Sequence, residues 1–496
     1  MLIMKQYLQA LLTGFLFLFI LFPGYSQFES EIECFTIIAG KNSTIDNSLM
    51  IAHNEDDWGD LLVNWYKVPE QDYPTGTKIQ LQNGAQIDQV RHTYSYLWVE
   101  MPGMQFSDSY MNQWGLTIAS DQCKSREDKA EIVDGGIGFY LRRIMIERAK
   151  TAREAVKIAG QLIDKFGYNY SGRTYCIADP NEAWMMAVVK GKHWVAQRVP
   201  SDQVAVIPNH YTIGEIDLSD TLNFLGSKDI YDYAFERNWY DPNSNKPFSF
   251  KKAYADQSTL KAIWNTPRFM TAINMLTKNK VNYGDDFPFS FIPKKKIAKQ
   301  DIMKVLASHL EGTDFESCSG KNPHDNIVSR ICSPGNQYGF VAQLRSNLPA
   351  EIAHVMWLSL KRPCTQAFVP WYFGIERIPK EFTYEDYNSA LSNHFSRVEL
   401  KEKTKTKAYW QYKKLADITD KDYSNLSGLQ IKNKNSIEKK LFDDQENFEN
   451  KFVRLYAKNK TNAIEFLQQY EEKVLNTSLN NTKEILKNIK KAVPNK

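Results

Sequence analysis

The chain has 496 residues, 43% of them hydrophobic and 24% charged, and a formal net charge of +4. This length is well above the size at which one hydrophobic core becomes hard to build, so we expect one large domain with an appendage, or two domains. The small net charge, with no dense basic stripe before residue 400, argues against nucleic acid as the main partner.

The N-terminal residues predict a secretory signal. The first 23 residues contain one basic residue, Lys5, followed by a Leu- and Phe-rich core that is too short for a membrane span. Small residues at positions 24 and 26 place the cleavage after Ser26. We therefore predict a signal peptide at 1–26 and an exported protein, periplasmic or secreted, with no stable membrane anchor after the signal is removed.

A short segment, residues 27–33, separates this cleavage site from Cys34 and is predicted to be a propeptide. If the chain is cut between Glu33 and Cys34, the cysteine becomes residue one, and its thiol and its own α-amino group can act as nucleophile and base. That chemistry is typical of an amidohydrolase. The rival use of an early cysteine, a lipoprotein anchor, needs small residues directly before it, and Glu31-Ile32-Glu33 stands there instead.

Between Cys34 and about Gly374, short apolar runs alternate with Gly, Pro and Asn, which predicts strands. Two segments have helical spacing instead, 138–149 and 152–166, and Thr151 with Glu154 predicts a capping box at the start of the second. Strands and helices in this mixed order favour an α+β domain of antiparallel sheets covered by helices. The strands are expected at 94–99, 116–119, 184–189, 194–199 and 204–207.

The texture changes after about residue 380. Residues 384–488 are poor in Gly and Pro and rich in Lys, Glu, Asn and Gln, with apolar residues three or four apart, so helices are expected. We divide the mature chain into a catalytic domain at 34–380 and a Lys-rich helical region at 381–496. The helical region is interpreted as a solvated appendage that packs on the core, with a polybasic binding surface as the alternative.

Six cysteines contain no C-x-x-C pair and no ligand spacing to His, so neither a metal nor another cofactor is predicted. In an exported protein, Cys318 and Cys332 form the pair to consider for a local disulfide, and free buried thiols are the alternative.

Eight short strings follow Cys34 in one order and carry a family resemblance. They are A-G-K (39–41), N-E-D (54–56), M-N-Q-W-G-L-T-I-A (111–119), E-R-A-K-T-A-R-E-A-V (147–156), I-A-D-P-N-E-A-W (177–184), W-V-A-Q-R-V-P (194–200), P-N-H-Y-T-I (208–213) and T-P-R-F (266–269). The sequence resembles the cysteine dipeptidase family related to secernins, within the choloylglycine-hydrolase-like N-terminal nucleophile hydrolases. The match covers residues 34–374, and it implies a four-layer αββα fold, here with a C-terminal helical appendage, and self-removal of the segment before Cys34.

The resemblance also implies roles for single residues. Asp56 is expected to orient the α-amino group of Cys34, unless it is a solvated loop acid. Asn209, in what we expect to be an exposed turn, matches the asparagine that donates to the oxyanion, unless it is an ordinary turn residue. Gln122 falls near a second donor position, because its amide can donate while Asp121 cannot. Arg268 matches an arginine near the nucleophile, where its charge would lower the pKa of the thiol.

One residue departs from the family pattern. His53 stands where the family commonly has Arg, and a histidine is only partly charged at neutral pH, so the thiolate is less strongly activated or the substrate is contacted differently. We assign His53 and Asn54 to substrate binding, and a half-buried strand histidine with a backbone partner is the alternative for His53.

These residues predict an exported dipeptidase that cleaves small peptides by thiol attack. An amidase of the same fold, acting on an N-acyl amino acid, a bile-acid conjugate or a penicillin-like compound, is the alternative, because pocket shape decides the substrate. A non-catalytic exported binding protein is the third hypothesis. The side-chain preference of the substrate and the formation of a homo-oligomer are left open.

Overall fold

The structure is a computed structural model that describes residues 34–57, 61–81, 83–316, 322–325, 330–396 and 404–492. These belong to one compact unit, Glu33–Lys496. The predicted signal peptide, the propeptide with Glu33, and Cys318 lie outside the described residues, so the two cleavages and the Cys318–Cys332 pairing stay predictions. In the described part of the chain, no helix is both long and apolar enough to cross a bilayer.

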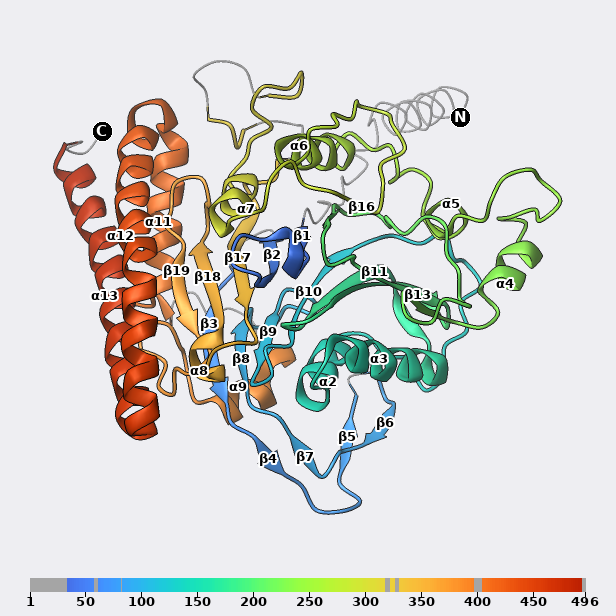
Figure 1. Cartoon of the computed structure of the whole chain (residues 1–496), viewed down its shortest axis with the longest axis horizontal. Helices are drawn as coiled ribbons and strands as arrows, with labels where there is room; N and C mark the ends of the chain where they lie inside the picture. Colours follow the sequence, from blue (N-terminus) through green and yellow to red (C-terminus); the bar gives the residue numbers. More distant parts are fainter. Residues whose placement is uncertain are drawn as a thin grey trace, which may run out of the picture. The chain divides into compact units, whose positions relative to one another are not determined.

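Two large antiparallel sheets form the centre of the molecule (Figure 1). The seven-stranded sheet has the order β16-β14-β1-β2-β17-β18-β19, and the eight-stranded sheet has the order β15-β13-β12-β11-β10-β9-β8-β3. The strands of the first are β1 (Phe35–Ala39), β2 (Leu49–Asp56), β14 (Val204–Ile207), β16 (Ser290–Phe291), β17 (Asn336–Leu344), β18 (His354–Leu360) and β19 (Val369–Tyr372). Those of the second are β3 (Asn64–Val68), β8 (Tyr96–Glu100), β9 (Ser109–Asn112), β10 (Thr117–Gln122), β11 (Tyr168–Ala178), β12 (Ala183–Gly191), β13 (Trp194–Arg198) and β15 (Phe224–Gly226).

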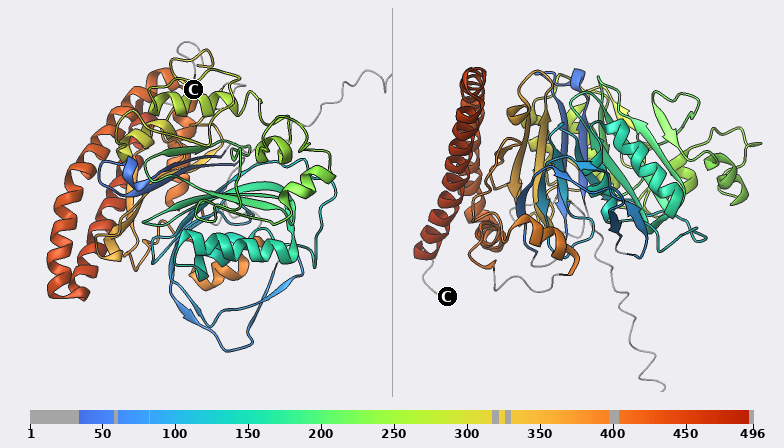
Figure 2. Two further views of the ribbon diagram at one scale, coloured as in Figure 1. Left: turned by 45° about the vertical axis from the view of Figure 1, so that its right-hand side comes forward. Right: turned by 90° about the horizontal axis from the view of Figure 1, so that it is seen from below.

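Helices cover the outer faces of both sheets and complete four layers. The helices α6 (Thr266–Leu276) and α7 (Lys299–Leu306) contact the seven-stranded sheet, and α2 (Tyr140–Arg148) and α3 (Ala152–Phe166) contact the eight-stranded sheet (Figures 1 and 2). One apolar core includes side chains of both sheets, among them Ile37 and Met185. The predicted α+β fold with an αββα arrangement is confirmed.

Local sequence signals explain the best-defined helix. Thr151 is the N-cap of α3, where its hydroxyl accepts from the N–H of Glu154, and Gly167 ends the helix at a φ of 76° that favours glycine. The Glu154 carboxylate accepts from the N–H of Lys150, one residue earlier than a standard capping box requires. The strands and helices predicted before residue 210 are present, with ends that differ by a few residues.

Smaller elements lie around these layers. They are β4 (Gln71–Asp72) paired with β7 (His92–Thr93), β5 (Lys78–Gln80) paired with β6 (Gln86–Asp88), α4 (Ile230–Glu236), α5 (Phe250–Tyr254), α8 (Ala350–Ala353), α9 (Tyr387–Asn393), and the 3-10 turns η1 (Lys41–Ser43) and η2 (His394–Ser396).

The C-terminal residues form α11 (Ala408–Lys421), α12 (Tyr423–Lys458) and α13 (Lys460–Ala492), which pack beside β18 and β19 (Figure 1). Their carboxylates reach the sheet: Glu438 accepts from the N–H of Phe368 at 2.9 Å and Glu471 from the N–H of Tyr372 at 2.7 Å. The helical region thus packs on the core as expected, and the boundary near residue 380 stays a prediction.

Candidate active site

Cys34 immediately precedes β1, a central strand of the seven-stranded sheet, and its side chain is 1% exposed. The thiol Sγ lies 3.4 Å from Oε1 of Glu55 and 3.8 Å from the main-chain oxygen of Asp56. Burial raises the pKa of the Cys34 thiol well above its usual value, with the nearby Glu55 carboxyl as the next cause. Before any cleavage at Cys34, the thiol is therefore kept protonated.

A continuous set of hydrogen bonds leads away from Glu55. Its Oε2 lies 3.1 Å from Nε2 of His53, and Nδ1 of His53 lies 2.7 Å from the Thr36 hydroxyl. That hydroxyl donates to Oδ2 of Asp121 at 2.6 Å. The path crosses from β1 and β2 to β10, so it joins the two sheets between their stacked faces.

The direction of each bond in this path follows from the last one. Because the Thr36 hydroxyl donates to Asp121, it accepts from Nδ1–H of His53, which leaves Nε2 of a neutral imidazole as an acceptor. The Glu55 carboxyl must then be protonated to donate to Nε2. All donors point from the thiol toward Asp121.

The pKa shifts agree with that assignment. Burial raises the pKa of Glu55 to about 8 and lowers the pKa of His53 to about 4, so both are uncharged at neutral pH. Burial raises the pKa of Asp121 to about 6, which leaves that carboxylate ionised at neutral pH. The path therefore begins at a neutral thiol and ends at one negative charge.

Arg268 approaches Cys34 from the opposite side. It lies in the first turn of α6, where Pro267 suits the helix start, and is fully buried. Its Nη1 donates to the carbonyl oxygen of Cys34 at 3.1 Å, and its Nη2 donates to Oδ1 of Asn209 and of Asn265, each at 2.9 Å. The expected lowering of the thiol pKa by Arg268 is not found: burial raises that pKa, and the guanidinium that opposes the rise is that of Arg173.

Asn209 belongs to the same group of contacts. Its side-chain amide donates to the main-chain oxygen of Gln122 at 3.2 Å, and the residue is 8% exposed, so the expectation of an exposed turn amide is wrong. The side-chain amide of Gln122 contacts the hydroxyl of Ser171 at 3.4 Å instead. The structure therefore brings Asn209 and Arg268 together beside Cys34, while Gln122 contributes a backbone carbonyl.

The residues of β2 alternate between two environments. His53 and Glu55 face the thiol, whereas the amide of Asn54 donates to the carbonyls of Leu306 at 2.9 Å and Ile331 at 2.7 Å. Asn54 thus contacts the end of α7 and the loops between α7 and β17. His53 is fully buried with side-chain partners, which differs from the half-buried strand histidine with a backbone partner.

Asp56 shares the side of β2 that faces those loops. It is fully buried and accepts from the hydroxyl of Ser333, so the alternative of a solvated loop acid is wrong. Its predicted contact with a free α-amino group stays a prediction, because the chain continues before Cys34.

Sequence reasoning missed Thr36 and Glu55 and set Asp121 aside because it cannot donate. The signal was the period of two in the strands: Cys34 with Thr36, and His53 with Glu55, fall on the same face. The register, with Thr36 opposite His53, then brings both pairs together. Only the stacking of the second sheet adds Asp121, which no local pattern reveals.

The profile of peptidase family C69 matches residues 33–436. The "Probable dipeptidase" of Latilactobacillus sakei is 26% identical over 405 residues, covering 79% of this chain and 81% of the relative. "Dipeptidase A" of Lactobacillus helveticus is 24% identical over 439 residues, covering 82% of this chain and 91% of the relative. Among solved structures, a conjugated bile acid hydrolase from Clostridium perfringens is 10% identical, with a TM-score of 0.31 over 68% of this chain and 96% of its own.

Proposed function

The chain belongs to peptidase family C69, and we propose that it is an exported cysteine dipeptidase that hydrolyses the amide bond of small peptides with the Cys34 thiol. The observation that carries the proposal is the grouping around Cys34: a buried hydrogen-bonded path on its side-chain side, and Arg268 with Asn209 on its carbonyl side. The dipeptidase names of the relatives support the substrate class.

We propose that the active form begins at Cys34. The thiol adds to the carbonyl carbon of Glu33, the bond from that carbon to the nitrogen of Cys34 breaks, and the nitrogen takes up a proton. Water then hydrolyses the thioester, which frees the Glu33 carboxylate and restores the thiol. The free α-amino group has a reference pKa near 8, so it can accept a proton at neutral pH.

Peptide hydrolysis would repeat the same chemistry on a second amide. The α-amino group takes the thiol proton, the thiolate attacks the peptide carbonyl, and the resulting ammonium gives its proton to the departing amine. Water then attacks the thioester and releases the remaining acid. The Asn209 amide, held from behind by Arg268, is the proposed donor to the oxyanion.

Two features of the uncleaved chain support the proposal that it is an inactive precursor. The thiol is 1% exposed, and burial raises its pKa, so it is neither accessible nor ionised. Removal of the residues before Cys34 would supply a new amine beside Sγ, as the proposed reaction requires.

The test combines the intact mass of the purified protein with a substrate panel of dipeptides, N-acyl amino acids, bile-acid conjugates and penicillins. We expect a chain that starts at Cys34 and cleaves dipeptides, with activity lost on thiol alkylation. A fully active chain that starts at Gln27 would rule out the N-terminal thiol. Turnover of the non-peptide amides alone would instead support the amidase, and a processed chain inactive on the whole panel would support a binding protein.

Export is a separate part of the proposal and rests on the composition of residues 1–26. Residues 1–33 fused to a reporter that is active only outside the cytoplasm should give reporter activity. A cytoplasmic chain that is still cut before Cys34 would contradict export without affecting the proposed hydrolysis.

A further inference from the structure

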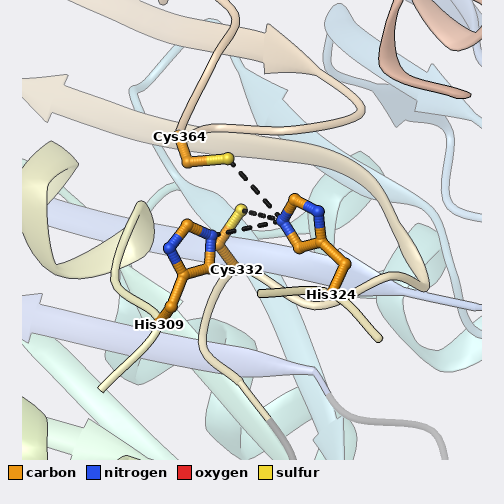
Figure 3. Close-up of side chains that lie close together, drawn as sticks. All are labelled: His309, His324, Cys332 and Cys364. Atoms are coloured by element: carbon orange, nitrogen blue, oxygen red, sulfur yellow. Dashed lines mark hydrogen bonds between the residues drawn. The ribbon is translucent and has the colours of Figure 1, made fainter. Parts of the chain in front are cut away.

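Four side chains outside the candidate active site converge on one point. They are His309, His324, Cys332 and Cys364, all buried, and their ligand atoms lie within 4.8 Å of one another (Figure 3). Nε2 of His324 lies 3.2 Å from Nε2 of His309, 3.8 Å from Sγ of Cys332 and 3.7 Å from Sγ of Cys364.

These separations are those of a tetrahedral metal site. Zinc bonds of about 2.0–2.1 Å to nitrogen and about 2.3 Å to sulfur, at tetrahedral angles, put two nitrogens about 3.4 Å apart and a nitrogen and a sulfur about 3.6 Å apart. The observed N–N distance of 3.2 Å and N–S distances of 3.7 and 3.8 Å lie close to both values. A cation at the centre would meet all four ligands with small shifts.

Carboxylates hold both imidazoles from behind. Nδ1 of His309 lies 3.2 Å from Glu311, and Nδ1 of His324 lies 2.8 Å from Asp420, which Arg362 contacts at 2.9 Å. Hydrogen bonds from Nδ1–H to a carboxylate fix the tautomer in which Nε2 carries the free lone pair, and they are the usual support of metal-bound histidine. Both lone pairs then face the same centre.

Without a cation the hydrogen-bonding capacity of the two Nε2 atoms is hard to satisfy. The two imidazole acceptors would face one another at 3.2 Å, with the weak donors of two buried thiols beside them. A disulfide between Cys332 and Cys364 would remove those donors and leave the two nitrogens opposed at 3.2 Å. A bound cation satisfies both nitrogens and both sulfurs together.

We propose that His309, His324, Cys332 and Cys364 bind one zinc ion. Two nitrogen and two sulfur ligands in tetrahedral positions favour zinc over magnesium or calcium, which prefer oxygen. With four protein ligands no position is left for substrate, so the ion is structural. Spacing in the sequence did not reveal this cluster, because the ligands come from separate segments: the loop after α7, the residues before β17, and the turn between β18 and β19.

The zinc ion would fix loops that contact β2. Asn54 donates to the carbonyls of Leu306 and Ile331, which stand close in sequence to His309 and Cys332. Ser333, next to Cys332, donates to Asp56. The ion therefore acts on the Cys34 region through positioning, by holding the segments against which this end of β2 packs.

The first experiment measures zinc per chain by elemental mass spectrometry, in full-length protein purified without chelators. We expect about one zinc ion in the wild type. Cys332→Ser, Cys364→Ser and His324→Gln should each lower zinc content at least about tenfold, because each removes a ligand. Cys123→Ser changes a buried cysteine outside the cluster and should keep the ion, and Cys34→Ala should keep it as well.

The second experiment uses the wild type and so does not depend on the folding of a variant. Metal is removed by a chelator, the chain is titrated with Zn²⁺, and alkylation of each cysteine is followed by peptide mass mapping. Zinc should protect Cys332 and Cys364 together, at one equivalent, and Co²⁺ should give the visible bands of a tetrahedral thiolate site.

Three outcomes would overturn the proposal. They are a Cys332–Cys364 disulfide in the purified chain, zinc retained in the Cys332→Ser/Cys364→Ser double variant, and alkylation of both thiols that zinc does not change. Asp420→Asn gives a graded check, since loss of its support of His324 should weaken zinc affinity about 10–100-fold without removing a ligand.

Discussion

Around Cys34 the interacting side chains come from neighbouring strands, and the register that places Thr36 opposite His53 sets their spacing. Around His309 they come from loops and a turn, and the sheet sets only the approximate place of Cys332 and Cys364. Both clusters combine buried cysteine and histidine with a carboxylate. The difference lies in the direction of the hydrogen bonds. Near Cys34 every donor points along one path toward Asp121, whereas near His309 both imidazoles donate outward to carboxylates and their Nε2 lone pairs converge. The paired strands hold the hydrogen-bonded path near Cys34 in place by themselves. The loops near His309 need the proposed zinc ion to bring their lone pairs together.

Substitution of cysteine should separate the two regions with the largest effect. Cys34→Ala removes the nucleophile, so we expect no measurable dipeptide hydrolysis, residues 27–33 still attached, and about one zinc ion still bound. Intact mass, turnover and zinc content measure the three outcomes. Cys34→Ser keeps a weaker nucleophile and should be processed slowly.

The double variant Cys332→Ser/Cys364→Ser should show the reverse pattern. It should lose zinc and melt at a lower temperature, and at temperatures well below its midpoint its turnover should be lowered but not abolished, because the ion only positions the segments that pack on β2. If it lost turnover as completely as Cys34→Ala while still folded, the two clusters would not be separable.

Asn209→Ala comes next. Loss of the proposed oxyanion donor should lower turnover about 10²–10³-fold. Because Asn209 is buried and accepts from Arg268, the same change should also lower stability by about 1–3 kcal/mol. Asn265→Ala removes another acceptor of Arg268, but it also removes the amide that holds the main chain of Asn209. Near-normal turnover of Asn209→Ala, with the same loss of stability, would mean that Asn209 is a structural residue and not the oxyanion donor.

The pH dependence of stability tests the protonated state of Glu55. Its folded pKa of about 8 is above the unfolded value, so the native chain keeps a proton that the unfolded chain releases, and stability falls as pH rises toward 8. His53 has a folded pKa of about 4, below its unfolded value of 6.5, so its contribution makes stability rise with pH between these two values and does not change above them. Glu55→Gln should therefore remove a loss of about 1–2 kcal/mol between pH 6.5 and 8.

Melting temperatures of Cys34→Ala and Cys34→Ala/Glu55→Gln would measure this effect, because both chains stay uncleaved. Parallel curves between pH 6.5 and 8 would show that Glu55 is ionised in the fold, which would break the path inferred from Thr36 and Asp121.

The smallest effect is expected on the exposed face of α12. Lys439 and Asp443 form an ion pair with both side chains more than half exposed. Lys439→Ala should change stability by less than about 0.5 kcal/mol, because water competes for both charges. This variant sets the baseline for the melting experiments in either region, and a larger change would mean that α12 carries more of the stability than its buried residues explain.

Local patterns predicted much of the fold. The cap of α3 and the helices after residue 380 depend on spacing within one element, so the sequence reveals them directly. The αββα arrangement came from the family resemblance, because many sheet orders fit the same alternation of strands and helices. Asn209 was misjudged because burial of its turn depends on α6, which is distant in sequence.

The same limit applies to the sites. Cys34 was found from its place after a signal-like segment, but Asp121 joins its neighbourhood only through the stacking of two sheets. The ligands His309 and Cys364 are 55 positions apart in the sequence, and no spacing rule connects them. Clusters of this kind become visible only when the loops have been placed.

The glutamates of α12 and α13 have a consequence for self-association. β19 is the last strand of its sheet, and the carboxylates of Glu438 and Glu471 accept from main-chain N–H groups at that border, where another strand would otherwise pair. These two carboxylates cap the edge strand, because they occupy N–H groups to which a further strand would have to bind. A chain cut before α12 would expose these N–H groups at the edge of β19. We expect such a chain to pair edge to edge with a second copy and to aggregate.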